Sequence, residues 1–490
     1  MRRFRSVSIT ARHALVGLFL LAGCTNERIV FREPTNPPPD EASGLLGYFD
    51  ASTNQTSCGN CHVGQQAEWE NTAHAGAYAT LANAPDAQAF CFSCHTVTER
   101  GNALTEAAGW DVVQDSAYHD VQCESCHGPG ADHVENPDNA NNVPLASIKV
   151  AVGGENNCGE CHSGVHHPFV DEWAASGHAR RDATREGRAE CVGCHTAQGA
   201  LASWGVRANY VEAGAALGQH EVIVCAVCHD PHGGQSGLDP GSGEGGPGSN
   251  IGQLRYRIDV PSQEENLCVK CHHKRAAPET QSATIRGPHS PEGPLLLGEG
   301  AGWFPPNFQP EIARILGTHG STANPKLCAT CHVLAFEVTD KETGEFLVRS
   351  VGHKFEAIPC IDANGAPTGA TDCTITQRTF ASCTTAGCHG TEDAARSAMT
   401  TAQARIAQLT TQVDAILALP AVAPDNKQND GRFTVADGAW FNAQLAKLPG
   451  SPIHNPFLME QLLIATIDQL RTTYNLPATS ISVSLTRQIT

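Results

Sequence analysis

The sequence predicts a mostly helical and coiled protein with little β-sheet, organised around something other than a large apolar core. Hydrophobic residues make up 40% of the 490 residues and aromatic residues 6%, whereas glycine and proline number 47 and 29. Few side chains are therefore available to form a core for a chain of this length. A short motif also recurs between Cys58 and His389, and its first six copies begin 32 to 35 residues apart. This spacing leaves room only for short helices and loops.

The recurring motif is Cys-x-x-Cys-His. It occurs eight times, at Cys58/Cys61/His62, Cys91/Cys94/His95, Cys123/Cys126/His127, Cys158/Cys161/His162, Cys191/Cys194/His195, Cys225/Cys228/His229, Cys268/Cys271/His272 and Cys328/Cys331/His332. A ninth copy has four residues between its cysteines, at Cys383/Cys388/His389. This spacing is typical of haem attachment, in which both thiols form thioethers and the histidine binds the iron as its proximal ligand. The sequence therefore predicts nine covalently bound c-type haems.

Zinc knuckles and disulfides are the alternative explanations of the motif. With 21 cysteines and 23 histidines in the chain, chance would give roughly 0.04 copies of the unstretched motif. Zinc sites need pairs of ligands, but they give no reason for a histidine to follow the second cysteine every time. We therefore interpret all nine motifs as haem sites.

Three cysteines remain outside the motifs. Cys24 belongs to the N-terminal leader discussed below, whereas Cys360 and Cys373 flank a loop that contains Gly365, Pro367 and Gly369. We expect these two cysteines to form a disulfide, because haem attachment takes place in an oxidising compartment.

The first 23 residues have the features of an export signal. Arginines precede an apolar run from Ala14 to Ala22, which is too short to span a membrane. The ending Leu-Ala-Gly-Cys resembles the lipobox of bacterial lipoproteins, in which the cysteine is acylated, so Cys24 is the predicted lipid attachment site. An ordinary secretory leader is the alternative. Thr25 is not the aspartate that resembles an inner-membrane retention signal, which favours the outer membrane, on its periplasmic or extracellular face.

Residues 24–45 are rich in proline and polar side chains and are predicted to be an extended tether. The formal charge is −19, and removal of the leader would take away four arginines and bring it to −23. Nucleic acid is therefore disfavoured as a partner. Other redox proteins or cytochromes and extracellular electron acceptors fit better, although acidity also serves solubility alone.

An internal repeat divides the next part of the chain. The first cysteines of motifs one to three recur in motifs four to six at offsets of 100, 100 and 102 residues. The stretch EWENTAHA, with Trp69 and His74, matches EWAASGHA, with Trp173 and His178. We therefore predict a first repeat at 46–145 and a second repeat at 146–250, each with three haems.

The remaining chain is predicted to form two further regions. Residues 251–392 hold the last three motifs, a small hairpin at 336–339 and 345–349, and the disulfide loop. Residues 393–490 form a helical region. One helix follows the apolar period from Ile406 to Leu417, and a second opens at Asn455 and Pro456, which suit the N-cap and first helical positions.

The sixth ligand of each iron decides between an electron carrier and a catalyst. Methionine is scarce, but thirteen histidines remain besides His13 and the nine proximal ones. The candidate distal ligands are His74, His133, His167, His178, His232, His289, His319, His353 and His454. His119 and His220 are possible substitutes, and the sequence leaves open which histidine serves which iron.

These residues resemble those of the multihaem c-type cytochrome superfamily. The stretch CESCHGPGADH and the W…HA pattern resemble tetrahaem and octahaem cytochromes of hydroxylamine oxidation, and the His-Asn-Pro before a long helix is similar to multihaem nitrite reductases. The lipobox combination resembles outer-surface cytochromes of metal-reducing bacteria. The resemblance implies a fold dominated by haem.

Three functional hypotheses follow. The first is a nonahaem lipoprotein that carries electrons along bis-histidine haems, in anaerobic respiration or extracellular electron transfer, and is not an enzyme. The second is an oxidoreductase acting on nitrite, hydroxylamine or a sulfur oxyanion at one five-coordinate haem. The related nitrite reductases use Cys-x-x-Cys-Lys at that haem, whereas every motif here ends in histidine. A third hypothesis is a structural subunit of a haem filament.

Overall fold

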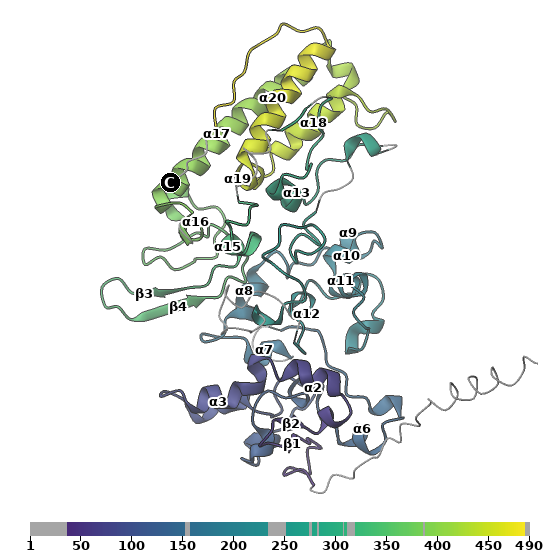
Figure 1. The fold of residues 1–490 in the computed structure, drawn as a ribbon, viewed down its shortest axis with the longest axis vertical. Helices are drawn as coiled ribbons and strands as arrows, with labels where there is room; N and C mark the ends of the chain where they lie inside the picture. The colour runs from purple at the N-terminus through teal and green to yellow at the C-terminus, as the bar shows by residue number, and fades with distance from the viewer. Residues whose placement is uncertain are drawn as a thin grey trace, which may run out of the picture. The chain divides into compact units, whose positions relative to one another are not determined.

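Short helices and irregular loops make up most of the folded chain (Figure 1). The structure is a computed structural model that describes residues 37–151, 157–233, 251–273, 277–281, 284–306, 308–310, 319–385 and 388–485. The predicted leader, Cys24 and most of the predicted tether lie outside these ranges. The chain divides into two units, Met1–Pro38 and Pro39–Thr490.

The folded unit begins earlier than the predicted end of the tether at residue 45. The backbone N–H of Asp40 donates to the Tyr118 hydroxyl at 2.9 Å, and the Asp40 carboxylate accepts from the N–H of Gly109 at 2.9 Å. Leu45 is fully buried. These contacts hold residues 40–45 on the first repeat, so they are not part of a solvated tether.

The described helices up to residue 385 have seven residues or fewer. They are α2 (Val63–Trp69), α3 (Ala77–Ala82), α4 (Phe92–His95), α5 (Glu124–His127), α6 (Ala131–Glu135), α7 (Cys158–Cys161), α8 (Phe169–Ala175), α9 (Ala183–Glu186), α10 (Val192–His195), α11 (Ala197–Ser203), α12 (Cys225–Cys228), α13 (Glu292–Leu297), α15 (Cys328–His332) and α16 (Ala381–Thr384). Turns of 3₁₀ helix connect several of them, including η1 (Cys58–Asn60). This part of the chain is mostly helix and coil, as predicted. It has little regular structure that could support a core.

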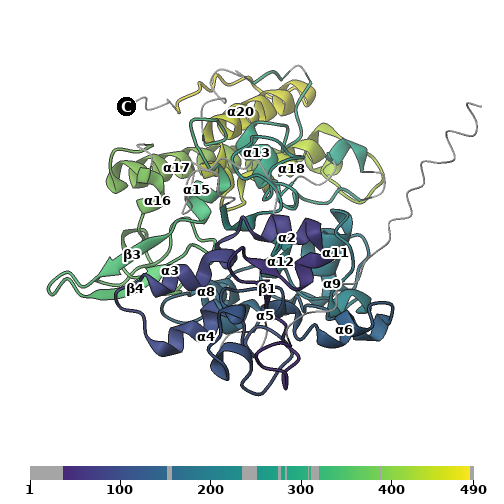
Figure 2. The same ribbon diagram turned by 60° about the horizontal axis from the view of Figure 1, so that its bottom comes forward.

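Two small antiparallel sheets complete the secondary structure. One pairs β1 (Tyr48–Asp50) with β2 (Gln55–Thr56), and the other pairs β3 (Phe336–Thr339) with β4 (Phe346–Ser350). The β3–β4 hairpin lies within one residue of its predicted place and projects outward in both ribbon views (Figures 1 and 2). Its turn is held by the Asp340 side chain, which accepts from the backbone N–H of Glu342 and of Thr343.

The two tryptophans of the sequence repeat occupy equivalent places. The indole N–H of Trp69 donates to the carbonyl of Val121 at 2.9 Å, and that of Trp173 donates to the carbonyl of Ile223 at 2.8 Å. Each bond ties the helix before a candidate distal histidine to the irregular segment before the third motif of its repeat.

The largest apolar core lies in the C-terminal region. It is formed by α17 (Glu392–Leu417), α18 (Val435–Ala446), α19 (Ser451–His454) and α20 (Pro456–Thr473), with Leu409, Val413, Leu462 and Ile467 fully buried (Figure 1). The Asn455 side chain accepts from the N–H of Leu458, which confirms the predicted N-cap of the last helix. The predicted helix around Ile406 is longer than the apolar period suggested. It begins at Glu392 and is capped by Thr391, whose hydroxyl accepts from the N–H of Ala394.

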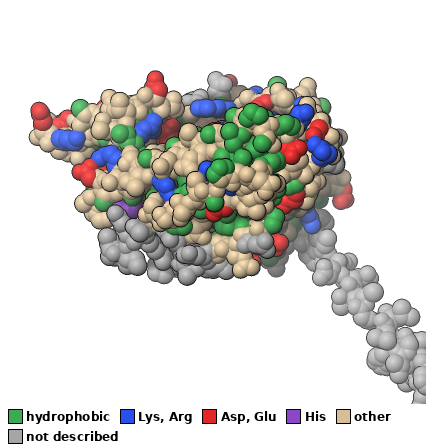
Figure 3. Space-filling view, turned by 90° about the horizontal axis from the view of Figure 1, so that it is seen from above, with side chains coloured by type: hydrophobic (Ala, Val, Ile, Leu, Met, Phe, Trp, Pro, Cys, Tyr) green, Lys and Arg blue, Asp and Glu red, His purple; other side chains and the backbone are tan. Residues whose placement is uncertain are grey.

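Within the described ranges, no helix is both long enough and apolar enough to cross a membrane. On the face shown in Figure 3, acidic and basic side chains are interspersed with apolar ones, so the negative charge is not gathered into a single patch there.

Candidate haem cavity and axial ligands

Motifs two to nine line one continuous cavity. Its volume is about 4460 Å³, and each of these eight motifs contributes its proximal histidine to the lining. Pockets for a single small ligand or cofactor have volumes of about 300–1,000 Å³. Divided among eight motifs, the cavity gives about 560 Å³ to each, so it has room for a series of cofactors and not for one substrate alone.

Single helical turns carry most of the motifs. In α4, α5, α7, α10, α12 and α15, the Cys-x-x-Cys segment is helical or borders the helix, and η1 holds the first motif in the same way. Residues three apart lie on one side of a helix, so both thiols of a motif face the same way. The motif's local folding thus matches what two thioethers on one haem edge require.

Cys61 of the first motif departs from this enclosed arrangement. We predicted that its thiol forms a thioether, but Cys61 is exposed and, like Cys58 and His62, is not among the described residues that line the cavity. It follows the last residue of η1, a turn in which only Gly59 is buried, so its side chain is left at the surface. Cys388 of the ninth motif is also exposed, although it does line the cavity. The thioether of Cys61 stays a prediction, and it would leave one edge of the first haem in contact with solvent.

The structure brings eight proximal histidines opposite eight of the nine candidate distal histidines. The ring centroids are separated by 6.4 Å in His62–His133, 6.1 Å in His162–His74, 6.1 Å in His127–His232, 6.2 Å in His272–His178, 5.9 Å in His195–His289, 6.2 Å in His229–His353, 6.4 Å in His389–His319 and 6.3 Å in His332–His454. An imidazole nitrogen lies about 2 Å from a bound metal and about 1 Å from its own ring centre, so two imidazoles on one metal have centroids about 6 Å apart. Each pair is therefore spaced to hold one iron atom.

Hydrogen bonds at Nδ1 orient many of these rings. Carbonyl oxygens accept from Nδ1, which leaves Nε2 as the nitrogen free to bind a metal. The bonds are His95 to Ala77 (2.9 Å), His127 to Pro144 (2.8 Å), His332 to Phe355 (2.9 Å), His319 to Ile453 (2.9 Å), His353 to Val351 (3.1 Å) and His229 to Gly252.

Burial keeps several of these imidazoles neutral. It lowers the pKa of His162 to about 3, and those of His178, His229 and His454 to about 4. An imidazole binds a metal ion in its neutral form. Both the burial of these rings and their spacing therefore suit a metal ion held between them.

Comparisons with known proteins agree with this chemistry. Residues 57–128 match the family model described as cytochrome c554 and c-prime. The C-type polyhaem cytochrome OmcB of Geobacter sulfurreducens is 29% identical over 198 residues, which cover 37% of this chain and 25% of OmcB. The multihaem cytochrome MtrA of Shewanella baltica (strain OS185) is 24% identical over 209 residues, which cover 39% of this chain and 54% of MtrA.

The chain is a multihaem c-type cytochrome. Covalently bound haem c is thus its cofactor. The chain spans only a quarter to about half the length of these relatives. No solved structure matches it significantly.

Cysteines of different motifs in this cytochrome meet in pairs. The pairs are Cys58–Cys123, Cys94–Cys161, Cys158–Cys225, Cys194–Cys271 and Cys268–Cys328, and in each the partner thiol is the largest cause of the pKa shift of both free thiols. Two haems attached to the motifs of one such pair would therefore have their attachment edges side by side. The pairs link motifs one with three, two with four, four with six, five with seven and seven with eight.

Two histidines of the pairs have a carboxylate beside Nδ1 in place of a carbonyl. For proximal His272 it is Glu292, with Nδ1 and Oε2 3.4 Å apart. For His232 it is Asp230 at 3.3 Å, and Asp230 also forms an ion pair of 2.6 Å with Arg255. Sequence reasoning missed these carboxylates, because isolated acids carry no spacing signal.

Buried Glu172 on α8 is a second group that the sequence analysis missed. It accepts from the backbone N–H of Val351 at 3.1 Å and of His353 at 2.7 Å. These bonds fix the segment that carries His353 against the second repeat. The only sequence signal is its place in the repeated Glu-Trp pair.

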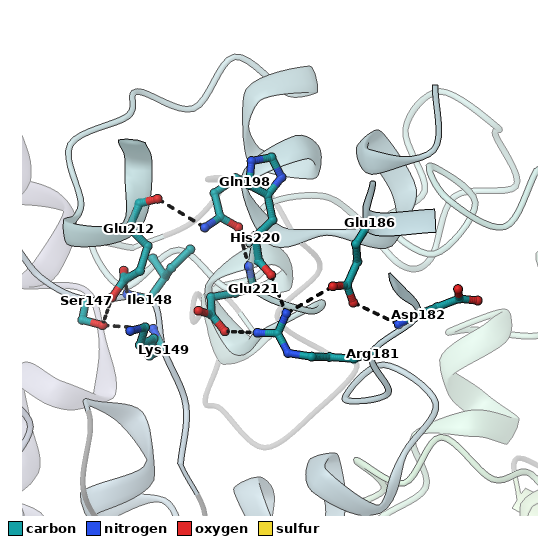
Figure 4. Close-up of polar contacts among 10 residues, drawn as sticks. All are labelled: Ser147, Ile148, Lys149, Arg181, Asp182, Glu186, Gln198, Glu212, His220 and Glu221. Carbon is teal, nitrogen blue, oxygen red and sulfur yellow. Dashed lines mark hydrogen bonds and ion pairs between the residues drawn. The ribbon is translucent and has the colours of Figure 1, made fainter. Parts of the chain in front are cut away.

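A polar network holds the segment that follows His178 (Figure 4). Arg181 donates to Glu186 at 3.2 Å, to Glu221 at 3.0 Å and to the carbonyl of His220 at 2.8 Å. Asp182 donates its N–H to the same Glu186 at 3.0 Å. The network fastens this segment to the chain just before the sixth motif.

The substitute histidines belong to none of the eight pairs and make other contacts. His119 stacks on Tyr78 with ring centroids 3.5 Å apart, and Nδ1 of His220 lies 3.2 Å from the hydroxyl of Thr196. His95 and His167 belong to none of the eight pairs above, although both line the cavity. Cys360 and Cys373 are joined in a disulfide.

Proposed function

We propose that this chain binds nine haem c groups and carries electrons, in anaerobic respiration or extracellular electron transfer. The eighteen motif cysteines would form the thioethers, and the nine motif histidines would be the proximal ligands. The eight facing histidine pairs carry the proposal. An iron held in such a pair has both axial positions filled by protein, which leaves no position for a substrate.

The chain's own residues tune each site in two ways. Bound haem supplies one-electron exchange at iron. Histidines on both sides of a bound iron would keep its reduction potential comparatively low, whereas methionine would raise it. Carbonyl acceptors at Nδ1 hold six of the imidazoles in one tautomer and orientation, so little rearrangement would accompany a change of charge at those irons.

We also propose that the chain is exported and anchored to the outer membrane by a lipid on Cys24. The support is the leader, the Leu-Ala-Gly-Cys ending and the proline-rich stretch that follows. Its partners would then be other redox proteins or cytochromes, or electron acceptors outside the cell.

The decisive experiment is low-temperature electron paramagnetic resonance of the oxidised full chain, with the haem content determined by mass. Nine haems that are all low-spin would support the carrier. A high-spin haem whose signal shifts when nitrite or hydroxylamine is added would contradict it.

A second candidate function is an oxidoreductase with one open haem. The observation in its favour is His95, the one proximal histidine without a partner among the eight pairs. Turnover of nitrite, hydroxylamine or a sulfur oxyanion by the purified protein would establish this function, and its dependence on the second motif would locate the site.

A further inference from the structure

One facing pair of histidines recurs in register with the sequence repeat. His74, which follows motif one, faces His162 of motif four. Its counterpart His178, which follows motif four, faces His272 of motif seven, so both the distal and the proximal histidine lie three motifs later. His127 of motif three faces His232, which follows motif six, and His229 of motif six faces His353, which follows motif eight, so here the proximal side moves by three motifs and the distal side by two. His74 and His178 thus keep the register of the repeat, whereas His62 of motif one faces His133 beyond motif three and does not share the arrangement of His162.

From this register we propose that His167 is the sixth ligand of the iron whose proximal ligand is His95. The inference rests on the proposed haem ligation. In the next repeat the counterpart of His95 is His195, which faces His289, a residue that follows motif seven. Three motifs before His195 is His95, and the position equivalent to His289 then follows motif four. His167 lies there, five residues after His162.

Contacts between the motifs support the same assignment. Motif two lies beside motif four, because the thiol of Cys94 is 3.8 Å from the carbonyl oxygen of Glu160 and the N–H of Gly101 donates to the Glu160 carboxylate. Motif five lies beside motif seven in the same way, through Cys194 and Cys271. Motif two thus adjoins motif four as motif five adjoins motif seven, and the partner of His195 comes from beyond that adjacent motif.

His162 is the alternative partner of His167. The two rings lie 5.8 Å apart at an interplanar angle of 87°. His162, however, already faces His74 at 6.1 Å, and an iron with a proximal ligand has a single axial position left. If His167 took that position, the register seen for His178 and His272 would be broken in the first repeat.

The assignment makes the two repeats interdependent. The second repeat would supply His167 and His232 to motifs two and three, whereas the first repeat supplies His74 to motif four. Neither repeat could complete its own haem sites alone.

The test uses the full chain and a background that lacks the second haem, C91S/C94S, in which mass analysis should give eight haems. In the wild-type background, H167A and H74A should each create one high-spin haem. In the C91S/C94S background, H74A should still create one and H167A should create none, because the haem that His167 binds is absent. The assignment would be overturned if H167A creates a high-spin haem in the C91S/C94S background, or if H167A creates no high-spin haem in the wild-type background.

The wild-type protein provides a second measurement should C91S/C94S fail to fold. A crystal or cryo-electron microscopy map would agree with the assignment if His167 contacts the haem attached at Cys91 and Cys94. Contact with the haem of Cys158 and Cys161, or an open sixth position at His95, would overturn it. The proposed function fails separately, if the wild type lacks haem or contains mainly high-spin haem.

Discussion

The Nδ1 atom of His272 lies 3.4 Å from a carboxylate oxygen of Glu292, whereas His95, His127 and His332 have carbonyl oxygens at the same nitrogen. A carboxylate makes the imidazole a stronger donor to its metal than a neutral acceptor does. It therefore stabilises ferric iron over ferrous iron. We expect this effect at the haem of motif seven.

Replacing Glu292 with glutamine should raise the reduction potential of one haem. Hydrogen bonds to charged groups are stronger than neutral ones by about 1 kcal/mol, which is roughly 40 mV for a one-electron couple. Spectroelectrochemical titration would measure the shift. Glu299→Gln is the control, because Glu299 lies on the same segment, carries the same charge and accepts from Gln263. An equal shift in both variants, or none in Glu292→Gln, would contradict the prediction.

Glu172 should hold the distal ligand of motif six in place. Glu172→Ala removes the acceptor of two N–H groups, those of Val351 and His353, at a buried position. Leaving both unsatisfied should lower the free energy of unfolding by roughly 2–4 kcal/mol. It should also loosen His353, so that a fraction of one haem becomes high-spin.

Glu68 offers the matched control for this variant. It precedes Trp69 as Glu172 precedes Trp173, but its side chain is exposed. Glu68→Ala should leave both the spin state and the stability unchanged. A fully low-spin Glu172→Ala protein would show that His353 is positioned by other contacts.

Glu124 should make stability depend on pH. It accepts from the N–H groups of Leu46, Gly47 and Gly130 at 2.7–2.8 Å, yet burial is the largest influence and raises its pKa from 4.5 to about 7. Between these two values the folded protein holds a proton that the unfolded chain releases. The free energy of unfolding should therefore fall as pH rises from 4.5 to 7, by at most about 3 kcal/mol, and Glu124 should add no further change above pH 7.

Denaturant titrations at several pH values would measure this dependence. Glu124→Gln cannot ionise, so its stability relative to wild type should increase between pH 4.5 and 7 and then stay constant. The exposed Glu135→Gln is the control and should parallel the wild type. A difference between wild type and Glu124→Gln that does not vary with pH would contradict the raised pKa.

The haem motifs and the candidate ligands could be named from sequence because their chemistry is local. A thioether pair and its histidine occupy five consecutive residues, whatever the fold around them. The partners of the proximal histidines could not be paired in this way. His332 faces a residue 122 positions away, and His162 faces His74, which lies beyond two other motifs. Nor does the motif reveal how well it is enclosed, since the exposure of Cys61 depends on what the rest of the chain packs against.

Helix α18 was not predicted because its sequence lacks a clear apolar period. It includes Gly438, where an added Cβ would collide with the ring of Trp303. Glycine is therefore needed for this close packing, at the expense of helix propensity. Tertiary contact determined the residue, and a contact with a residue 135 positions earlier leaves no local signal.

The disulfide should stabilise its loop without affecting the haem sites. Cys360 and Cys373 are 13 residues apart, and the N–H of Thr368 donates to the carbonyl of Cys360 at 2.9 Å inside the loop. Closing a loop of this length stabilises the folded state by about 3 kcal/mol in the chain-entropy model. The variant C360A/C373A should lose up to that amount in denaturant titrations and retain its haem content and its spin states. A thiol reductant should lower the stability of the wild type and leave the variant unchanged. Loss of a haem from the variant would show instead that this loop is needed to assemble the ninth motif at Cys383 and Cys388.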